Sequence, residues 1–170
     1  RAGPRRWLLT PFIEEGGATV LFAPGGSCKS FLALAMAMTV ASGVDLVGSS
    51  HVKPMPVLYL DWETEAPEHA RRYQALRAGV GMEQEPPVFY KRMRTALPGV
   101  ADRLAREIAK KGVGLVVIDS LGKARGGEPE SAEVTLNTFN AIDQLRCTAI
   151  CVDHLSKEAM RQTKGRLAPF

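Results

Sequence analysis

The sequence predicts an α/β domain in which a mostly parallel sheet is covered by helices on both faces. Five short apolar stretches alternate with longer segments of helical periodicity, which is the pattern of strands joined by crossover helices. The stretches are continuously apolar, as expected for strands of a parallel sheet that is buried on both sides. A glycine-rich loop joins the first stretch to the first helical segment, and in such folds ligands bind at the carboxyl ends of the strands.

The predicted elements follow one another in a regular order. Residues 1–17 mix basic residues with Trp-Leu-Leu and a Glu-Glu-Gly-Gly turn, so we expect a segment that lies across the fold before the first strand. The first helix is apolar on nearly every side and stops at Gly43, as in a helix that is buried against the sheet and capped by glycine. The pattern places strands at 18–22, 57–61, 88–90, 115–119 and 149–153, and helices at 29–42, from Pro67 toward Gly79, from Val100 to Gly112, and at 131–145 with Val134, Phe139 and Ile142 turned inward.

Length and composition favour one domain. With 170 residues, of which 45% are hydrophobic, the chain can bury a complete core, so residues 1–170 are interpreted as a single domain. Residues 155–170 form a short basic tail, which we interpret as a trimmed or incomplete C-terminal end. The only long apolar run, 31–41, is about half the length of a membrane span, so no membrane partner is expected.

Charge and cysteine content set further bounds. The net charge of +4 permits a nucleic-acid partner but is too small to require one. Cys28, Cys147 and Cys151 lack the spacing of a disulfide framework or a zinc site, which favours a reducing, cytoplasmic location.

Residues 18–30, ATVLFAPGGSCKS, have the order strand, glycine-rich loop, lysine, serine and helix. In a loop of this kind backbone N–H groups surround a phosphate, Lys29 reaches the β- and γ-phosphates, and the Ser30 hydroxyl can bind Mg²⁺. The pattern G-x-x-x-x-G-K-[ST] is altered, because Ala23 and Cys28 occupy its two glycine positions. The alternative is a glycine-rich turn before a core helix, which leaves the Lys-Ser pair unexplained. The candidate nucleotide-binding residues are Pro24, Gly25, Gly26, Ser27, Cys28, Lys29 and Ser30.

Two acidic residues lie at the ends of predicted strands. Asp119 ends the strand at 115–119, where a carboxylate is well placed to hold Mg²⁺ through its hydration shell opposite Ser30. Its alternative role is a turn or helix cap after a core strand. Glu63 follows the strand at 57–61 and is the candidate general base that orients and deprotonates the water attacking the γ-phosphate. The alternative is that Glu63 or Glu65 belongs to the first turn of the next helix and interacts with its positive end.

His154 ends the last predicted strand and could sense the γ-phosphate through a hydrogen bond. A histidine at a strand end can equally be a structural donor whose partners lie in the protein. A further set of basic residues is interpreted as ordinary surface charge unless it lines the channel of a ring: Arg71, Arg72, Lys91, Arg92 and Arg94.

Four sequence motifs, in this order, resemble those of the RecA-like ATPases, and within them plasmid RepA-type hexameric helicases, DnaB-type helicases and RadA/Sms repair ATPases. APGGSCKS resembles the Walker A motif, VLYLDWE the strand with the catalytic glutamate, LVVIDSLGKA the Walker B motif, and ICVDHLSKE the sensor strand. The resemblance covers nearly the whole chain. It implies a RecA-like P-loop NTPase core that uses ATP and Mg²⁺, with Lys29 and Ser30 on phosphate and metal, Glu63 activating water, Asp119 as the Walker B acid and His154 as the sensor.

The resemblance also bears on the basic tail. After the sensor strand, members of this group place a mobile loop that faces DNA and residues that reach the nucleotide of a neighbouring subunit. The alternative is a solvated basic tail without a specific role. The residues concerned are Lys157, Arg161, Lys164 and Arg166.

Together these features predict Mg²⁺-dependent ATP hydrolysis by an oligomer, a hexameric ring or a filament, that acts on single-stranded DNA in replication, recombination or repair. The expected setting is the cytoplasm of a bacterial or phage-infected cell. A first alternative is a nucleotide-binding switch or loader with little turnover, because Cys28 alters the loop. A second is a P-loop kinase acting on a small molecule, for which the sequence shows no acceptor motif.

Overall fold

The computed structural model describes residues 5–49, 53–128 and 131–154. Its centre is a five-stranded sheet in the order β3-β7-β6-β4-β5, and every neighbouring pair of strands is parallel. The expected parallel α/β fold is therefore confirmed. The strands are β3 (Ala18–Ala23), β4 (Val57–Asp61), β5 (Val88–Arg92), β6 (Leu115–Asp119) and β7 (Thr148–His154).

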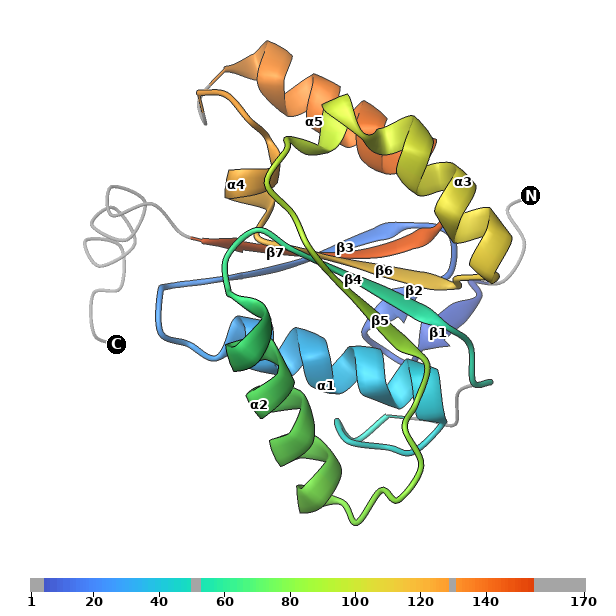
Figure 1. The fold of residues 1–170 in the computed structure, drawn as a ribbon. Coiled ribbons are helices and arrows are strands. Elements are labelled where there is room, and N and C mark those ends of the chain that lie inside the picture. The colour runs from blue at the N-terminus through green and yellow to red at the C-terminus, as the bar shows by residue number, and fades with distance from the viewer. Residues whose placement is uncertain (1–4, 50–52, 129–130, 155–170) are drawn as a thin grey trace, which may run out of the picture.

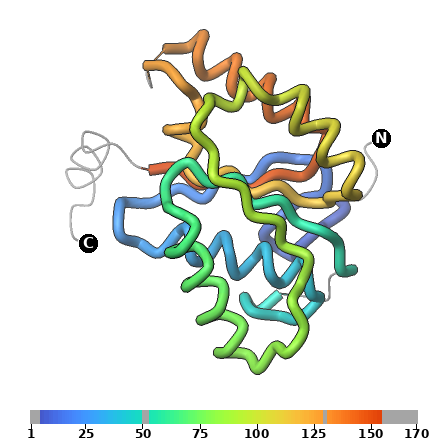
Figure 2. Tube along the Cα trace, in the orientation of Figure 1, coloured from blue at the N-terminus to red at the C-terminus, as the bar shows by residue number. Residues whose placement is uncertain are grey.

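Helices cover both faces of the sheet (Figure 1). The chain covers one face first and the other afterwards, as the colours along the tube in Figure 2 show. Helices α1 (Lys29–Ser42) and α2 (Ala66–Gly79) lie on the first face; the short helix η1 (Leu97–Gly99) precedes α3 (Ala101–Lys111), α4 (Leu121–Ala124) and α5 (Ala132–Gln144) on the second. Within the described ranges, no helix combines the length and the apolar character needed to cross a lipid bilayer.

The N-terminal segment forms a small second sheet that the sequence pattern did not predict. Strands β1 (Trp7–Leu9) and β2 (Ile13–Glu14) pair antiparallel. Leu9 and Ile13 are fully buried and pack into the same cluster as the apolar residues of α1. The segment therefore lies across the fold before β3, as expected, and closes one side of α1.

Two hydrophobic clusters, one on each face, hold the layers together. Successive residues of a strand point to opposite faces, so Val57 and Tyr59 of β4 join the cluster around α1 while Leu58 and Leu60 join the cluster around α3 and α5. Helix α1 ends as expected, because Gly43 takes a left-handed conformation and its N–H donates to the Thr39 carbonyl. Burial of α1 fixes the position of the loop that precedes it.

Two expectations about burial were wrong. Phe139 of α5 does not point inward, since it is 38% exposed and Val134 is only partly buried. The buried side of α5 instead runs through Thr138, whose hydroxyl donates to the Val134 carbonyl and is thereby satisfied inside the fold. The second wrong expectation was that every strand is buried on both faces. One face of the outer strand β3 is open, because Phe22 is 56% exposed.

Candidate active site

The loop between β3 and α1 has two residues in the left-handed region. Gly26 has φ 78°, and Cys28, which directly precedes α1, has φ 59° and ψ 22°. Ala23 ends β3 and is absent from the described non-glycine residues with positive φ. The two departures from the loop pattern therefore differ: alanine suits the conformation at position 23, whereas Cys28 holds a conformation that favours glycine.

The ammonium group of Lys29 is bound by its own loop. Lys29 is 7% exposed, and its Nζ donates to the carbonyl oxygens of Ala23 and Pro24 at 2.8 and 2.7 Å. Ser27 Oγ lies 3.4 Å from the same nitrogen and donates to the Pro24 carbonyl at 2.7 Å. Lys29 Nζ is therefore held within the loop. A phosphate bound in the loop would replace the two carbonyl oxygens as its hydrogen-bond acceptors.

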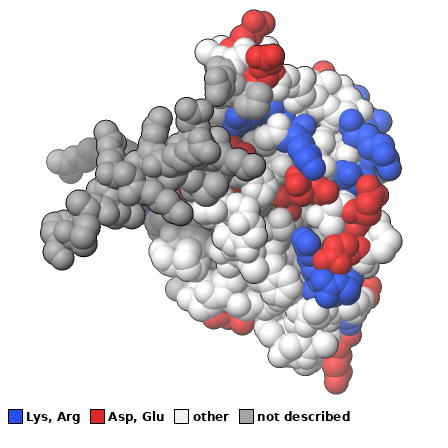
Figure 3. All heavy atoms as spheres, turned by 90° about the vertical axis from the view of Figure 1, so that its left-hand side faces the viewer, with Lys and Arg blue, Asp and Glu red and all other residues white. Residues whose placement is uncertain are grey.

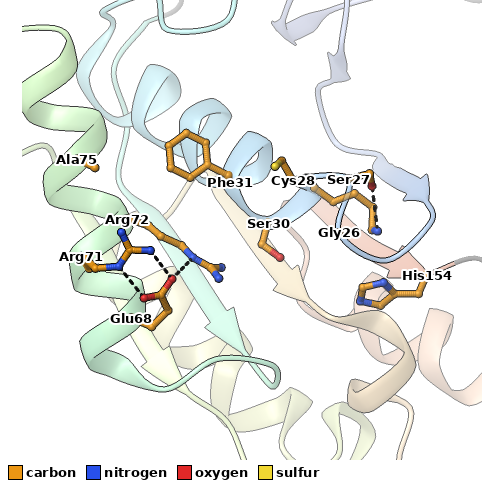
Figure 4. Close-up of a pocket in the computed structure, with 11 residues that line it drawn as sticks. Gly26, Ser27, Cys28, Ser30, Phe31, Glu68, Arg71, Arg72, Ala75 and His154 are labelled. Atoms are coloured by element: carbon orange, nitrogen blue, oxygen red, sulfur yellow. Dashed lines mark hydrogen bonds and ion pairs between the residues drawn. The ribbon is translucent and has the colours of Figure 1, made fainter.

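A cavity of about 340 Å³ lies between this loop and α2 (Figure 4). The structure brings residues 26–31 and His154 to its wall, whereas Pro24 and Gly25 are not part of the lining. The opposite wall is one face of α2, whose residues are spaced three and four apart: Glu68, Arg71, Arg72 and Ala75.

Arg71 and Arg72, interpreted from the sequence as surface charge, both line the cavity, and the Arg71 side chain is 71% exposed. Glu68 holds them: the Nε atoms of the two arginines each lie 2.8 Å from a Glu68 carboxylate oxygen. These hydrogen bonds, that of Arg71 first, lower the pKa of Glu68 to about 2. The helical spacing of 68, 71, 72 and 75 was the signal that could have identified this wall from the sequence.

Asp119, at the end of β6, has an unsatisfied oxygen. The side chain is 1% exposed, its Oδ2 accepts a hydrogen bond from the Tyr59 hydroxyl at 2.7 Å, and its buried Oδ1 has no hydrogen-bond partner among the described residues. The Tyr59 hydroxyl also lies 3.4 Å from the Ser30 carbonyl oxygen, so Asp119 and the start of α1 meet at this tyrosine. A buried carboxylate oxygen with no donor, beside a serine of a phosphate-binding loop, fits a divalent cation.

The capping role considered for Asp119 has no support in the geometry. Helix α4 has Ser120 as its N-cap residue, and no side chain caps it. The peptide bond between Asp119 and Ser120 is cis.

Glu63 lies in the turn after β4 and contacts the segment after β6. Its Oε2 is 3.1 Å from both Ser120 Oγ and Lys123 Nζ. Burial acts to raise the pKa of Glu63, but the hydrogen bonds from Lys123 and Ser120 outweigh it and hold the pKa below its ordinary value. Helix α2 begins at Ala66, after the N-cap residue Glu65, so Glu63 does not belong to its first turn. Its carboxylate is ionised and oriented by two donors.

The turn that carries Glu63 is built on Asp61, a residue that the sequence reasoning missed. Its Oδ1 accepts the backbone N–H groups of Glu63 and Thr64, both at 2.7 Å. Burial is the main cause that raises the pKa of Asp61. An aspartate whose carboxylate accepts the N–H groups two and three residues further along forms an Asx turn. The signal available in the sequence was an aspartate at the end of an apolar strand.

The end of β7 is anchored by an ion pair. Asp153 Oδ2 accepts a hydrogen bond from Arg125 Nη2 at 2.8 Å, and its Oδ1 accepts the backbone N–H of His154. His154 itself is exposed and lines the cavity. The basic tail residues Lys157, Arg161, Lys164 and Arg166 lie outside the described residues.

Charges of both signs occur on the side of the molecule where the strands end. Figure 3 looks onto this side, and in the area that is not grey acidic and basic side chains lie next to one another. Two ion pairs involve residues at or just after strand ends: Arg92 with Glu65, at 3.2 Å, and Lys123 with Glu63, at 3.1 Å.

A known family accounts for this combination of fold and loop. The sequence model of the AAA_25 family, described as an AAA domain, matches residues 1–160. The match includes the glycine-rich loop, the strand ends that carry Asp61 and Asp119, and α2. The chain therefore belongs to the AAA_25 family of AAA domains, with the RecA-like P-loop fold and nucleotide binding that the family implies.

Proposed function

We propose that this chain is a Mg²⁺-dependent ATPase that works as an oligomer, a ring or a filament, and couples ATP hydrolysis to single-stranded DNA. The observation that carries the ATPase part is the buried Oδ1 of Asp119, which has no partner among the described residues and lies on a carboxylate joined through the Tyr59 hydroxyl to the Ser30 backbone. Family membership supports nucleotide binding. The coupling to DNA is part of the proposal. So is the helicase, recombination or repair role, which belongs to the groups that the chain resembles.

In this proposal each side chain has one task. Lys29 exchanges its carbonyl partners in the loop for β- and γ-phosphate oxygens. Ser30 and Asp119 would hold Mg²⁺, which neutralises charge on the phosphates when bound. Glu63, ionised and held by Ser120 and Lys123, orients the attacking water and takes its proton. His154 reports the state of the cavity to the segment that follows it.

The position of His154 supports the coupling to DNA. His154 lines the cavity, and in the sequence it directly precedes the segment with Lys157, Arg161, Lys164 and Arg166. A signal from the γ-phosphate would therefore have a short path to basic residues that suit a nucleic-acid backbone or the nucleotide of a neighbouring subunit. The net charge of +4 is compatible with such a partner.

A second candidate function is a nucleotide-dependent switch or loader with little turnover. The left-handed conformation of Cys28, where the loop pattern has glycine, favours it. A strained residue next to the phosphates can change the loop geometry that catalysis needs while leaving binding intact.

Two variants test the proposal. Lys29→Ala is expected to abolish nucleotide binding, whereas Glu63→Gln should bind ATP like the wild type and release no phosphate. Phosphate release should be measured with and without single-stranded DNA at several salt concentrations, beside the particle size in the presence of ATP. Normal hydrolysis by Glu63→Gln would refute the role of Glu63, and tight binding without hydrolysis by the wild type, DNA present, would establish the switch instead. A DNA stimulation that does not fall with salt would remove the basic tail from the proposal.

A further inference from the structure

Tyr59 occupies the junction between the three elements that meet at the site. It lies in the middle of β4 and points toward α1, and its ring is fully buried in the cluster on that face. Its hydroxyl is 2.7 Å from Asp119 Oδ2 at the end of β6 and 3.4 Å from the Ser30 carbonyl oxygen in α1. A tyrosine between two leucines of β4 thus places one polar atom between the two proposed metal-binding residues.

The ring of Tyr59 is held on its other side by α2. His69 packs against it edge to face, with ring centroids 4.7 Å apart, and is itself buried. A buried ring in contact with a second ring has little freedom to turn, so the hydroxyl is fixed relative to the sheet. The contact to Asp119 is therefore a built feature of the core rather than one of several positions of a mobile side chain.

We propose that Tyr59 is a positioning residue of the metal site, which holds Asp119 through Oδ2 and thereby reserves Oδ1 for the cation. The inference rests on the proposed Mg²⁺-dependent function. An aspartate carboxylate rotates about its Cβ–Cγ bond and can present either oxygen. A hydrogen bond to one oxygen leaves the other to face the cation. Partners that orient a metal-binding side chain in this way contribute strongly to metal affinity in proteins.

The chain offers two matched controls. Tyr90 in β5 donates to the Thr64 carbonyl at 3.2 Å and lies 3.4 Å from Asp61 Oδ2, so its hydroxyl serves the neighbouring carboxylate. Tyr73 in α2 donates to the Pro86 carbonyl at 3.3 Å, away from both carboxylates. Removing any of the three hydroxyls is the same chemical change, but only one of them touches Asp119.

The test is the Mg²⁺ dependence of nucleotide binding. Binding of a fluorescent ATP analogue is followed by anisotropy, first with chelator and then across a Mg²⁺ titration, for the wild type, Tyr59→Phe, Tyr90→Phe and Tyr73→Phe. Tyr59→Phe should raise the Mg²⁺ concentration at half-saturation about tenfold or more, and its binding in chelator should equal that of the wild type. The two control variants should titrate like the wild type.

Each outcome decides between the two proposals. If Tyr59→Phe titrates like the wild type, the positioning role is wrong while the ATPase proposal stands. If the wild type binds the analogue equally well with and without Mg²⁺, the metal site itself is wrong and Tyr59 has no such role. Should Tyr59→Phe fail to fold, Tyr59→4-aminophenylalanine, which keeps a donor on the ring, must titrate like the wild type, and loss of its Mg²⁺ dependence would overturn the proposal.

Discussion

The ends of β4 and β6 carry two aspartates whose Oδ1 atoms have different surroundings. Asp61 and Asp119 lie opposite each other in neighbouring parallel strands, and both are 1% exposed. Each also has a tyrosine hydroxyl nearby, from Tyr90 and Tyr59 respectively. Asp61 uses Oδ1 for two backbone N–H groups, whereas the Oδ1 of Asp119 receives no hydrogen bond from the part of the chain that the structure describes.

This difference separates a structural carboxylate from one that is available to a ligand. The hydrogen bonds of Asp61 shape the turn that presents Glu63 and offset part of the cost of burying its carboxylate, although burial still raises the pKa of Asp61. Among the described residues the buried carboxyl group of Asp119 has a hydrogen-bond partner on one oxygen only, which is unfavourable for stability and useful for binding a cation. Cys28 shows the same trend, because the nucleotide loop also holds an unfavourable backbone conformation.

The largest stability effect is expected on the Asp61 side of the comparison. Asp61→Ala removes a buried carboxylate and leaves the partly buried N–H groups of Glu63 and Thr64 without their acceptor, so the free energy of unfolding should fall by about 2 kcal/mol. Urea unfolding measures it. Asp45→Ala is the matched control, since Asp45 accepts two backbone N–H groups in the same way but is exposed, and water can replace it. Equal losses in the two variants would show that Asp61 is not a buried structural carboxylate.

A decrease in stability at low pH, of intermediate size, is expected from His69, which contacts the tyrosines next to both aspartates. His69 packs between Tyr59 and Tyr90, with ring centroids 4.7 and 4.1 Å away. Burial, and then the charge of Arg72, lowers the pKa of His69 to about 4. The unfolded chain takes up the proton near pH 6.5, so stability from the neutral ring is present above that pH and is lost as the pH falls toward 4.

For the wild type, this residue alone should remove about 2 kcal/mol of unfolding free energy between pH 7 and pH 5. His69→Phe keeps a ring between the two tyrosines and should not show this part of the decrease. Urea unfolding of both proteins at the two pH values checks it. The same pH dependence in both would mean that His69 is charged in the folded protein.

The smallest effect is expected in the nucleotide loop. Cys28→Gly removes the cost of a left-handed non-glycine residue and should raise the unfolding free energy by about 0.5–1 kcal/mol. Arg146→Gly is the control, because Arg146 has φ 51° and lies outside the cavity lining. Both variants should gain stability, but only Cys28→Gly should change the rate of phosphate release. If Cys28→Gly is less stable than the wild type, the strain assigned to Cys28 is wrong.

The sequence predicted the parts of the site that are local in the chain. One apolar run, two glycines and the Lys-Ser pair predicted the unit of β3, loop and α1. Because polar residues follow the apolar strands, the sequence also predicted that Asp119 and Glu63 lie at the carboxyl edge of the sheet. Properties that depend on packing were missed. In the sequence Tyr59 is part of the apolar stretch 57–61. Its hydroxyl contacts Asp119 only because β4 lies beside β6 in the sheet.

The orientation of helices was the other limit. Arg71 and Arg72 face the cavity because α2 turns His69 toward the sheet, and that rotation is set by contacts with Tyr59 and Tyr90. Similarly, Thr138 displaced Phe139 from the inner side of α5, since a threonine that bonds to its own helix can be buried.

We propose that Asp119, and not Asp61, is the carboxylate of the metal site. Asp61→Asn and Asp119→Asn change one atom each and preserve side-chain shape, so their Mg²⁺ titrations of nucleotide binding can be compared directly. Asp119→Asn should raise the Mg²⁺ concentration at half-saturation about tenfold or more and abolish phosphate release, while Asp61→Asn should titrate within about twofold of the wild type. Equal changes in the two variants, or a titration of Asp119→Asn like that of the wild type, would contradict the account.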